Sequence, residues 1–285
     1  MRIETVLLLN KRPRHSIAVL NSLVENGVEQ VRAFMDYSDE PAVVACQTRL
    51  VETIRARTDI GVTLHRHSRK LGLAGSVRFA MQSALADADA AILLEDDCVV
   101  RPGGIDFFRE ALTELRDDPR IRSVCGYLFP CPFVREGAQP LLLRRFCSWG
   151  WATWRERWQE HEPNLRRVVE VFAERNIRID EFAPDLAELC GLSRYIENRV
   201  DVWSVAWALE HFLTGTFTVY PSESMIDNIG FDGSGQNCPP TAAFVTLGRS
   251  QRQRWDWSRL LQCPENDEML KRFMNANGRK IYPSS

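Results

Sequence analysis

Two hydrophobic patterns alternate over residues 1–126. Short runs of consecutive apolar residues are typical of strands buried on both faces, and apolar residues three to four positions apart are typical of amphipathic helices. The expected strands cover residues 6–9, 31–35, 62–64, 90–94 and 121–125. Helical spacing recurs between them, and the first helix is expected to begin at Ser16 and end at Gly27. The alternation predicts an α/β fold with a mostly parallel sheet flanked by helices.

Polar side chains follow the ends of these strands. They are Asn10, Asp36, the basic run 65–70 and the acidic triplet Glu95-Asp96-Asp97. The carboxyl ends of parallel strands share one edge of the sheet, and ligands of such sheets bind beyond that edge. We therefore expect these residues to gather at one rim.

Residues 127–285 show no comparable alternation. They hold the tryptophans, helical stretches near 180–192 and 201–213, a glycine-rich loop at 228–235, and an arginine-rich tail beyond 249 with a helix near 267–275. Neither an internal repeat nor a low-complexity linker interrupts them. The simplest organisation is one domain in three parts, 1–126, 127–248 and 249–285.

Composition narrows the class of protein. The chain has 285 residues, of which 45% are hydrophobic and 26% charged, which is too apolar for a disordered chain. The net charge of -2 gives no overall attraction to nucleic acid. The eight cysteines include no C-x-x-C pair, which favours buried, reduced thiols. The apolar N-terminal run is too short for a signal peptide and no stretch reaches the ~18 uncharged residues of a membrane span. We expect a cytoplasmic protein.

The acidic triplet is the strongest chemical signal. Three carboxylates at the end of a buried strand repel one another unless a positive charge lies between them. A hard divalent cation, Mn²⁺ or Mg²⁺, would supply that charge through oxygen ligands. The alternative is a solvated acidic turn. Because the chain has neither a Walker phosphate loop nor G-x-G-x-x-G, a bound nucleotide would need the cation to hold its diphosphate.

The acidic triplet and several further segments resemble the motifs of a known enzyme family. Glu95-Asp96-Asp97 is similar to the D-x-D-type motif of GT-A glycosyltransferases, in the E-D-D form of the N-acetylglucosaminyltransferase I type. Further segments resemble bacterial, family 2-like sugar transferases in the same order: Asn10–Pro13, Leu71–Val77, Cys147–Trp154, Asp201–Trp207, Tyr220–Pro221 and Asn228–Gly235. The resemblance covers about residues 5 to 237, and the ordered set is more specific than the triplet.

The resemblance implies roles for single residues. Asp97 would be the direct metal ligand, and Glu95 and Asp96 would hold the ribose or metal-bound water. Residues near the first three strand ends would also bind the nucleotide. Asn10, Arg12 and Asp36 belong to this set, and Arg12 and Asp36 would lie near the nucleobase. At Gly72 and Gly75 the backbone would approach the nucleotide sugar. Gly-x-x-Gly also occurs at ordinary helix starts. The loop 228–235 would close over the donor. Many relatives have a histidine near the end of that loop, whereas His211 is the nearest here.

Asp201 matches the position of the general base in inverting members of the family. Its alternative is an N-cap for the helix that carries Trp203 and Trp207. Glu197 and Asp227 are the next candidates. A positioned carboxylate that takes the acceptor's proton typically contributes about 10²–10⁴-fold to the rate.

The function that the resemblance implies is metal-dependent, inverting transfer of a hexosyl or N-acetylhexosaminyl group. The donor would be a nucleotide sugar, with UDP preferred, and the acceptor a hydroxyl of a cell-surface glycan or glycolipid. Residues 1–126 would bind the donor and 127–248 the acceptor. The alternatives are a sugar-nucleotide nucleotidyltransferase, whose glycine-rich signature is absent from Asn10–Arg14, and a non-catalytic glycan-binding module.

Aromatic and basic residues outside these motifs leave choices open. Trp149 or Trp151 could line a sugar pocket, whereas Trp154 and Trp158 are expected to share one buried helix face. His65 and His67 share a face of a strand and could chelate a metal, but a solvated loop is the simpler interpretation. Interleaved arginines and tryptophans in the tail could contact anionic lipid at the inner face of the membrane, or the tail could pack back on the domain. These tail residues are Arg249, Arg252, Arg254, Trp255, Trp257 and Arg259.

Overall fold

The computed structural model describes residues 1–285 except 160–169, 172, 177–202, 236–239, 247–253 and 278–285. Its strands are β1 (Ile3–Leu9), β2 (Gln30–Met35), β3 (Gly61–Arg66), β4 (Ala90–Leu94), β5 (Cys98–Val100), β6 (Ile121–Cys125), β7 (Leu141–Leu143), β8 (Trp151–Trp154), β9 (Phe217–Tyr220), β10 (Ile226–Asn228) and β11 (Leu261–Gln262). Its helices are α1 (Pro13–Glu25), α2 (Pro41–Arg55), α3 (Gly72–Asp87), α4 (Gly104–Glu114), α5 (Arg155–Gln159), α10 (Trp203–Thr214) and α11 (Pro264–Asn277).

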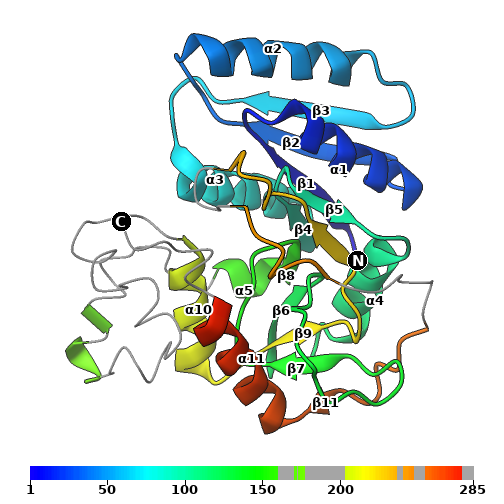
Figure 1. The fold of residues 1–285 in the computed structure, drawn as a ribbon, viewed down its shortest axis with the longest axis vertical. Coiled ribbons are helices and arrows are strands. Elements are labelled where there is room, and N and C mark those ends of the chain that lie inside the picture. The colour runs from blue at the N-terminus through cyan, green and yellow to red at the C-terminus, as the bar shows by residue number, and fades with distance from the viewer. Residues whose placement is uncertain (160–169, 172, 177–202, 236–239, 247–253, 278–285) are drawn as a thin grey trace.

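One sheet runs through the length of the molecule. It has nine strands in the order β11-β7-β9-β6-β8-β4-β1-β2-β3, which Figure 1 shows from bottom to top. β1 pairs in parallel with β2 and β4, and β2 with β3. β8 is antiparallel to both of its neighbours, β4 and β6. The predicted α/β fold with a mostly parallel sheet flanked by helices is therefore confirmed.

Alternate residues of the central strands pack on opposite faces of the sheet. Along β1, Leu7 and Leu9 belong to one buried cluster, which also contains the apolar faces of α1, α2 and α4. Val6 and Leu8 belong to a second cluster, built with α3 and the tryptophans of α10. Burial on both faces explains why these strands are continuous apolar runs rather than alternating ones.

Strand β8 corrects the prediction for the tryptophan-rich segment. All four of its residues are buried, and Trp154 ends this strand rather than sharing a helix face with Trp158. Trp151 is fully buried against Trp203 and Trp207, at ring separations of 5.2 and 5.8 Å, so of the two tryptophans considered for a sugar pocket it is the one enclosed in the core. These aromatics fill the space between the sheet and α10.

The ends of two predicted elements also differ. α1 begins at Pro13, whose fixed φ suits a first helical position, and Ser16 lies inside the first turn with its hydroxyl donating to the carbonyl of Arg12. Ser16 is therefore not the cap. Gly27 follows the end of α1 with φ +70°, as expected of a residue that terminates a helix. β3 extends through His65 and Arg66, which the sequence pattern had placed in the basic run 65–70 after the strand.

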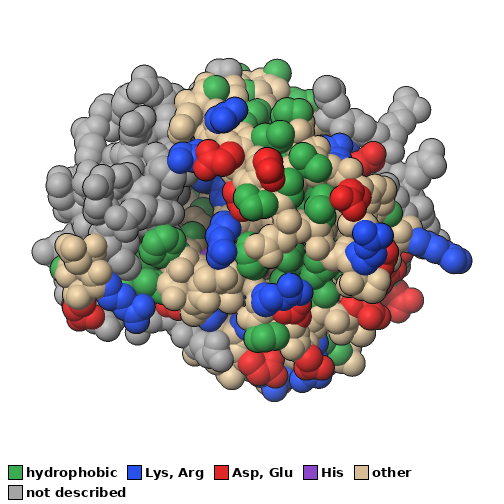
Figure 2. Space-filling model, turned by 90° about the horizontal axis from the view of Figure 1, so that it is seen from below, with side chains coloured by type: hydrophobic (Ala, Val, Ile, Leu, Met, Phe, Trp, Pro, Cys, Tyr) green, Lys and Arg blue, Asp and Glu red, His purple; other side chains and the backbone are tan. Residues whose placement is uncertain are grey.

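The tail packs against the domain where it is described. Trp255 is buried 4.8 Å from the ring of Phe107, and Nε1 of Trp257 donates to Glu110 of α4 at 3.0 Å. On the face in Figure 2, basic and acidic side chains are interspersed rather than separated. Among the described residues, each helix is too short or too polar to span a bilayer. These contacts favour the packed-back tail over one whose tryptophans reach lipid. Of the cysteines that the structure describes, four are buried free thiols as expected, whereas Cys46 and Cys263 are half-buried.

Replacing Trp154 tests the packing of β8. Its side chain is fully buried and its Nε1 donates to the carbonyl of Leu112 at 2.8 Å. We expect Trp154→Ala to lower the free energy of unfolding by about 3–5 kcal/mol, because it leaves a cavity and an unpaired carbonyl. Leu73→Ala, at a side chain that is 49% exposed, should stay within about 0.5 kcal/mol. Urea unfolding measures both, and equal effects would contradict the assignment of Trp154 to the core.

Candidate functional site

The parallel strands bring the predicted polar residues to one edge of the sheet. Met35 of β2 lies beside Leu9 of β1, and Leu94 of β4 beside Leu7. The residues that follow these strands, Asn10, Asp36 and Glu95, therefore leave the sheet at the same rim. Loop 228–235 reaches this rim from the second half of the chain, because β10 pairs with β5 directly after the acidic triplet.

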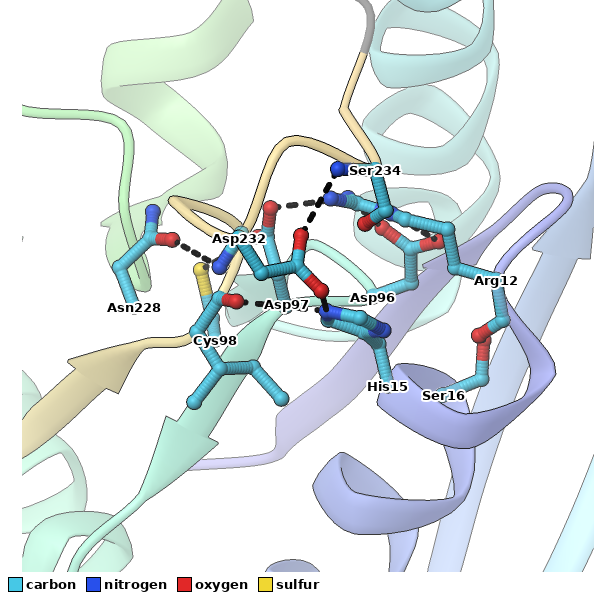
Figure 3. Close-up of polar contacts among 11 residues, drawn as sticks. Arg12, His15, Ser16, Asp96, Asp97, Cys98, Asn228, Asp232 and Ser234 are labelled. Atoms are coloured by element: carbon cyan, nitrogen blue, oxygen red, sulfur yellow. Dashed lines mark hydrogen bonds and ion pairs between the residues drawn. The ribbon is translucent and has the colours of Figure 1, made fainter. Parts of the chain in front are cut away.

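The triplet is deep in the structure. Glu95 is half-buried, and Asp96 and Asp97 are 5% and 9% exposed. Nε of Arg12 donates to Oδ2 of Asp96 at 3.2 Å, and Nη2 contacts both Oδ1 of Asp96 and, at 2.8 Å, Oδ2 of Asp97. Figure 3 shows Arg12 reaching across from the start of α1 to the two carboxylates. In this structure a guanidinium thus supplies positive charge between Asp96 and Asp97.

Burial and mutual repulsion determine the ionisation of these groups. Burial raises the pKa of Glu95 to about 8, and the charges of Asp97 and Asp96 add to the effect. Burial also raises the pKa of Asp96, although the hydrogen bond from Arg12 opposes it. Burial alone would lower the pKa of Arg12, but its hydrogen bonds and charge interactions with Asp96 and Asp97 outweigh that effect and raise it. Arg12 hydrogen-bonds to the two aspartates, and its charge only partly offsets the burial and repulsion that raise the pKa of Glu95.

Loop 228–235 lies directly against Asp97. The amide of Ile229 donates to the carbonyl of Asp97 at 2.9 Å. A Cβ on Gly230 would overlap Oδ2 of Asp97 and lie 3.0 Å from Nη1 of Arg12, so a larger residue here would force the Asp97 side chain to shift. Nε2 of His15 lies 3.2 Å from Oδ2 of Asp232 and 3.3 Å from the carbonyl oxygen of Ile229 (Figure 3). The loop is therefore held over the strand end from the first turn of α1.

The stem of this loop is fixed by an ion pair. Nη2 of Arg101 lies 2.6 Å from Oδ1 of Asp227, and Thr246 donates its hydroxyl to the same carboxylate at 2.8 Å. Asp227, a secondary candidate for the general base, is therefore held in a structural pair. Further along, the ring of Phe231 stacks on Phe244 at 5.1 Å and meets Trp149 edge-on at 5.2 Å. Of the two tryptophans proposed for a pocket, only Trp149 lies beside the loop.

Asp36 and the glycines form a helix start. Asp36 accepts hydrogen bonds from the amides of Leu71 and Gly72 at 2.8 and 2.9 Å, which stabilise the N-terminus of α3. Gly72 has φ +70°, a conformation that favours glycine, and at Gly75 a Cβ would lie 3.0 Å from that of Leu71. Asn10 is exposed at the rim. Their expected roles in nucleotide binding stay predictions.

His211, His65 and His67 make packing and hydrogen-bond contacts within the fold. Nε2 of His211 lies 2.9 Å from the hydroxyl of Ser123 beneath the sheet, where both residues are buried. His65 and His67 stack on Phe34, at ring separations of 5.0 and 6.4 Å, rather than converging on a common point. The proposed base Asp201 and the secondary candidate Glu197 lie outside the described residues.

The donor chemistry of the triplet suits a hard cation. Magnesium is commonly held by one or two carboxylates together with substrate phosphates. Within the part of the chain that the structure describes, no group of three or more His, Cys, Asp or Glu residues is arranged to hold a metal ion. Asp97 alone could bind such a cation together with a diphosphate, but its Oδ2 is engaged by Arg12. A cation at this atom would require Arg12 to move.

Two features of the site were missed by sequence reasoning. The contact of Arg12 with Asp96 joins residues 84 positions apart, and that of His15 with Ile229 joins residues 214 apart. No local pattern indicates such pairs. The basic residue next to the helix-initiating Pro13 was the only available hint, and it had been assigned to the nucleobase.

No protein-family model matches this chain, and no curated protein matches its sequence. Among solved structures, it is similar to S. aureus TarS 1–349, with 9% identity, a TM-score of 0.46, and coverage of 79% of this chain and 60% of that one. It is also similar to the mannosyltransferase PcManGT from Pyrobaculum calidifontis in complex with GDP-Man and Mn²⁺, with 16% identity, a TM-score of 0.37, and coverage of 59% and 46%. It is similar as well to mouse xyloside xylosyltransferase 1 in its apo form, with 12% identity, a TM-score of 0.36, and coverage of 56% of this chain and 69% of that one. The match thus spans less than two thirds of the first two structures.

Changing Glu95 tests the electrostatics of the strand end. A carboxyl whose pKa is raised to about 8 in the folded chain keeps its proton there while the unfolded chain loses it. Its contribution to stability is therefore present at low pH and is lost as pH rises through about 8. We expect Glu95→Gln, which is neutral at every pH, to exceed wild type in free energy of unfolding by a margin that grows from pH 5 to pH 8.5. Urea unfolding at several pH values measures this margin. The exposed Glu52→Gln is the control, and a margin independent of pH would refute the assignment.

Proposed function

We propose that this chain is a GT-A glycosyltransferase that transfers a sugar from a nucleotide donor to an acceptor hydroxyl with inversion. The observation that carries the proposal is the triplet of carboxylates at the carboxyl end of β4, lying beneath loop 228–235. Sheets of this class bind their ligands at that edge. The ordered motifs between residues 5 and 237 support the same interpretation.

The donor side of the proposed site consists of elements from residues 1–126. Asn10 and Arg12 follow β1, Asp36 follows β2, and Gly72 and Gly75 lie at the start of α3. We assign these residues to a nucleotide sugar, with UDP as the preferred nucleotide, and residues 127–248 to the acceptor, a cell-surface glycan or glycolipid.

Leaving-group charge is the central problem of sugar transfer. The nucleoside diphosphate develops negative charge as its bond to the anomeric carbon breaks, and a divalent cation, Mn²⁺ or Mg²⁺, bound by Asp97 would stabilise that charge. Asp96 and Glu95 lie beside it and can accept hydrogen bonds from ribose hydroxyls or from water. Loop 228–235, packed over the triplet, would exclude bulk water and so limit hydrolysis of the donor.

Proton removal from the acceptor requires a base on the face of the sugar opposite the diphosphate. We propose Asp201 for this role, on the basis of its place in the ordered motifs. Asp227 is bound to Arg101 and Thr246, which leaves it poorly placed to accept a proton. The proposed base would immediately precede α10, whose buried tryptophans fix the start of that helix against the sheet.

The metal-dependent part of the proposal can be tested by calorimetry. A panel of nucleotide sugars, with and without Mn²⁺, should identify a donor that binds and is slowly hydrolysed. For that donor, Asp97→Asn should lower the affinity in the presence of Mn²⁺ by at least roughly 10–100-fold, because it removes the charged ligand of the cation. Asp118→Asn, at a carboxylate paired with Arg120 on the surface, should bind as wild type does. Unchanged affinity in Asp97→Asn would exclude the metal site, and failure of the whole panel would exclude the function.

The assignment of the base predicts a separation of binding from turnover. Asp201→Asn should keep the donor affinity of wild type, while transfer to an acceptor falls by about 10²–10⁴-fold, because the amide cannot take the acceptor's proton. Donor affinity is measured by calorimetry and transfer by release of the nucleoside diphosphate. Near-normal turnover would rule out Asp201 and leave Glu197 as the next residue to test.

A further inference from the structure

Arg12 occupies an unusual position for a surface-loop arginine. Its side chain is only 15% exposed, and its guanidinium contacts Asp96 through two nitrogens and Asp97 through one. A planar guanidinium can bridge two carboxylates in this way, whereas a single ammonium group matches the geometry poorly. The bridge satisfies oxygens of both aspartates that would otherwise be buried, charged and unpaired.

Oδ2 of Asp97 is shared by Arg12 and the loop. It accepts a hydrogen bond from Nη2 of Arg12 and also faces Gly230 so closely that a single Cβ there would overlap it. The same Cβ would lie 3.0 Å from Nη1 of Arg12. A cation that binds this oxygen would therefore have to take the place of Arg12.

A second contact ties the loop to the same turn of α1. His15, three residues after Arg12, holds Asp232 and the carbonyl of Ile229 at 3.2 and 3.3 Å. The main chain adds the bond from the amide of Ile229 to the carbonyl of Asp97. The start of α1, the end of β4 and loop residues 229–232 are thus joined by polar contacts, which Figure 3 shows.

We propose that Arg12 is the resident counter-ion of Asp96 and Asp97 and that a divalent cation must displace it to bind Asp97. The inference rests on the proposed function, since it concerns the same site. It reassigns Arg12 from the nucleobase to the acidic strand end.

Manganese alone tests this proposal, with no nucleotide or sugar present. The free Mn²⁺ in a titration is measured by electron paramagnetic resonance for wild type, Arg12→Gln, Arg12→Lys and Arg57→Gln. The last variant is the matched control, because it removes an Arg–Asp pair, with Asp59, far from the site. We expect Arg12→Gln to bind Mn²⁺ about tenfold or more tightly than wild type, the change that follows from removing one charged competitor. Arg12→Lys should lie between them, and Arg57→Gln should match wild type.

If Arg12→Gln fails to fold, Arg12→Lys decides the comparison, because it keeps the positive charge. Equal Mn²⁺ affinity in the Arg12 variants and wild type would overturn the proposal. That result would leave nucleotide-sugar binding intact, and so is distinct from failure of the proposed function.

Discussion

Electrostatic repulsion among three consecutive carboxylates is the constraint around which this rim is organised. Glu95, Asp96 and Asp97 end a strand whose own residues are completely buried, so they cannot all turn to solvent. Arg12 hydrogen-bonds to two of them, whereas burial and the charges of Asp97 and Asp96 raise the pKa of Glu95 despite the opposing charge of Arg12. The start of α1 is held in place by the same contacts.

Two levels of the structure cooperate to produce this arrangement. The parallel pairing of β1, β2 and β4 brings their carboxyl ends together, and the packing of α1 on that side of the sheet sets the position from which Arg12 and His15 reach out. The β5–β10 ladder and the Arg101–Asp227 pair then direct a loop from a distant part of the chain onto the triplet. A transferase would require the same combination, a rigid base for the leaving group and a cover that excludes water.

Local sequence patterns were sufficient to predict much of the fold. The apolar runs predicted β1, β2, β4 and β6 to within a few residues, because burial on both faces leaves a signal in consecutive positions. Strand β8 was not predicted from the sequence, because its four residues, rich in tryptophan, suit a helix face equally well. Its strand conformation depends on pairing with β4 and β6. The triplet was found as a chemical anomaly. Its partner Arg12 was not, since the two are 84 positions apart and periodicity carries no information at that distance.

The place of β8 in the sheet has a consequence for dividing the protein. Strand β4 pairs on one side with β1 but on the other with β8, which belongs to residues 151–154. A fragment that stopped at residue 126 would leave the Ala90–Leu94 backbone with a bare, wholly apolar border. Such borders recruit the strands of other molecules and lead to aggregation. The sheet of residues 1–126 is thus completed by the half that follows it, and we expect neither half to be stable in solution without the other.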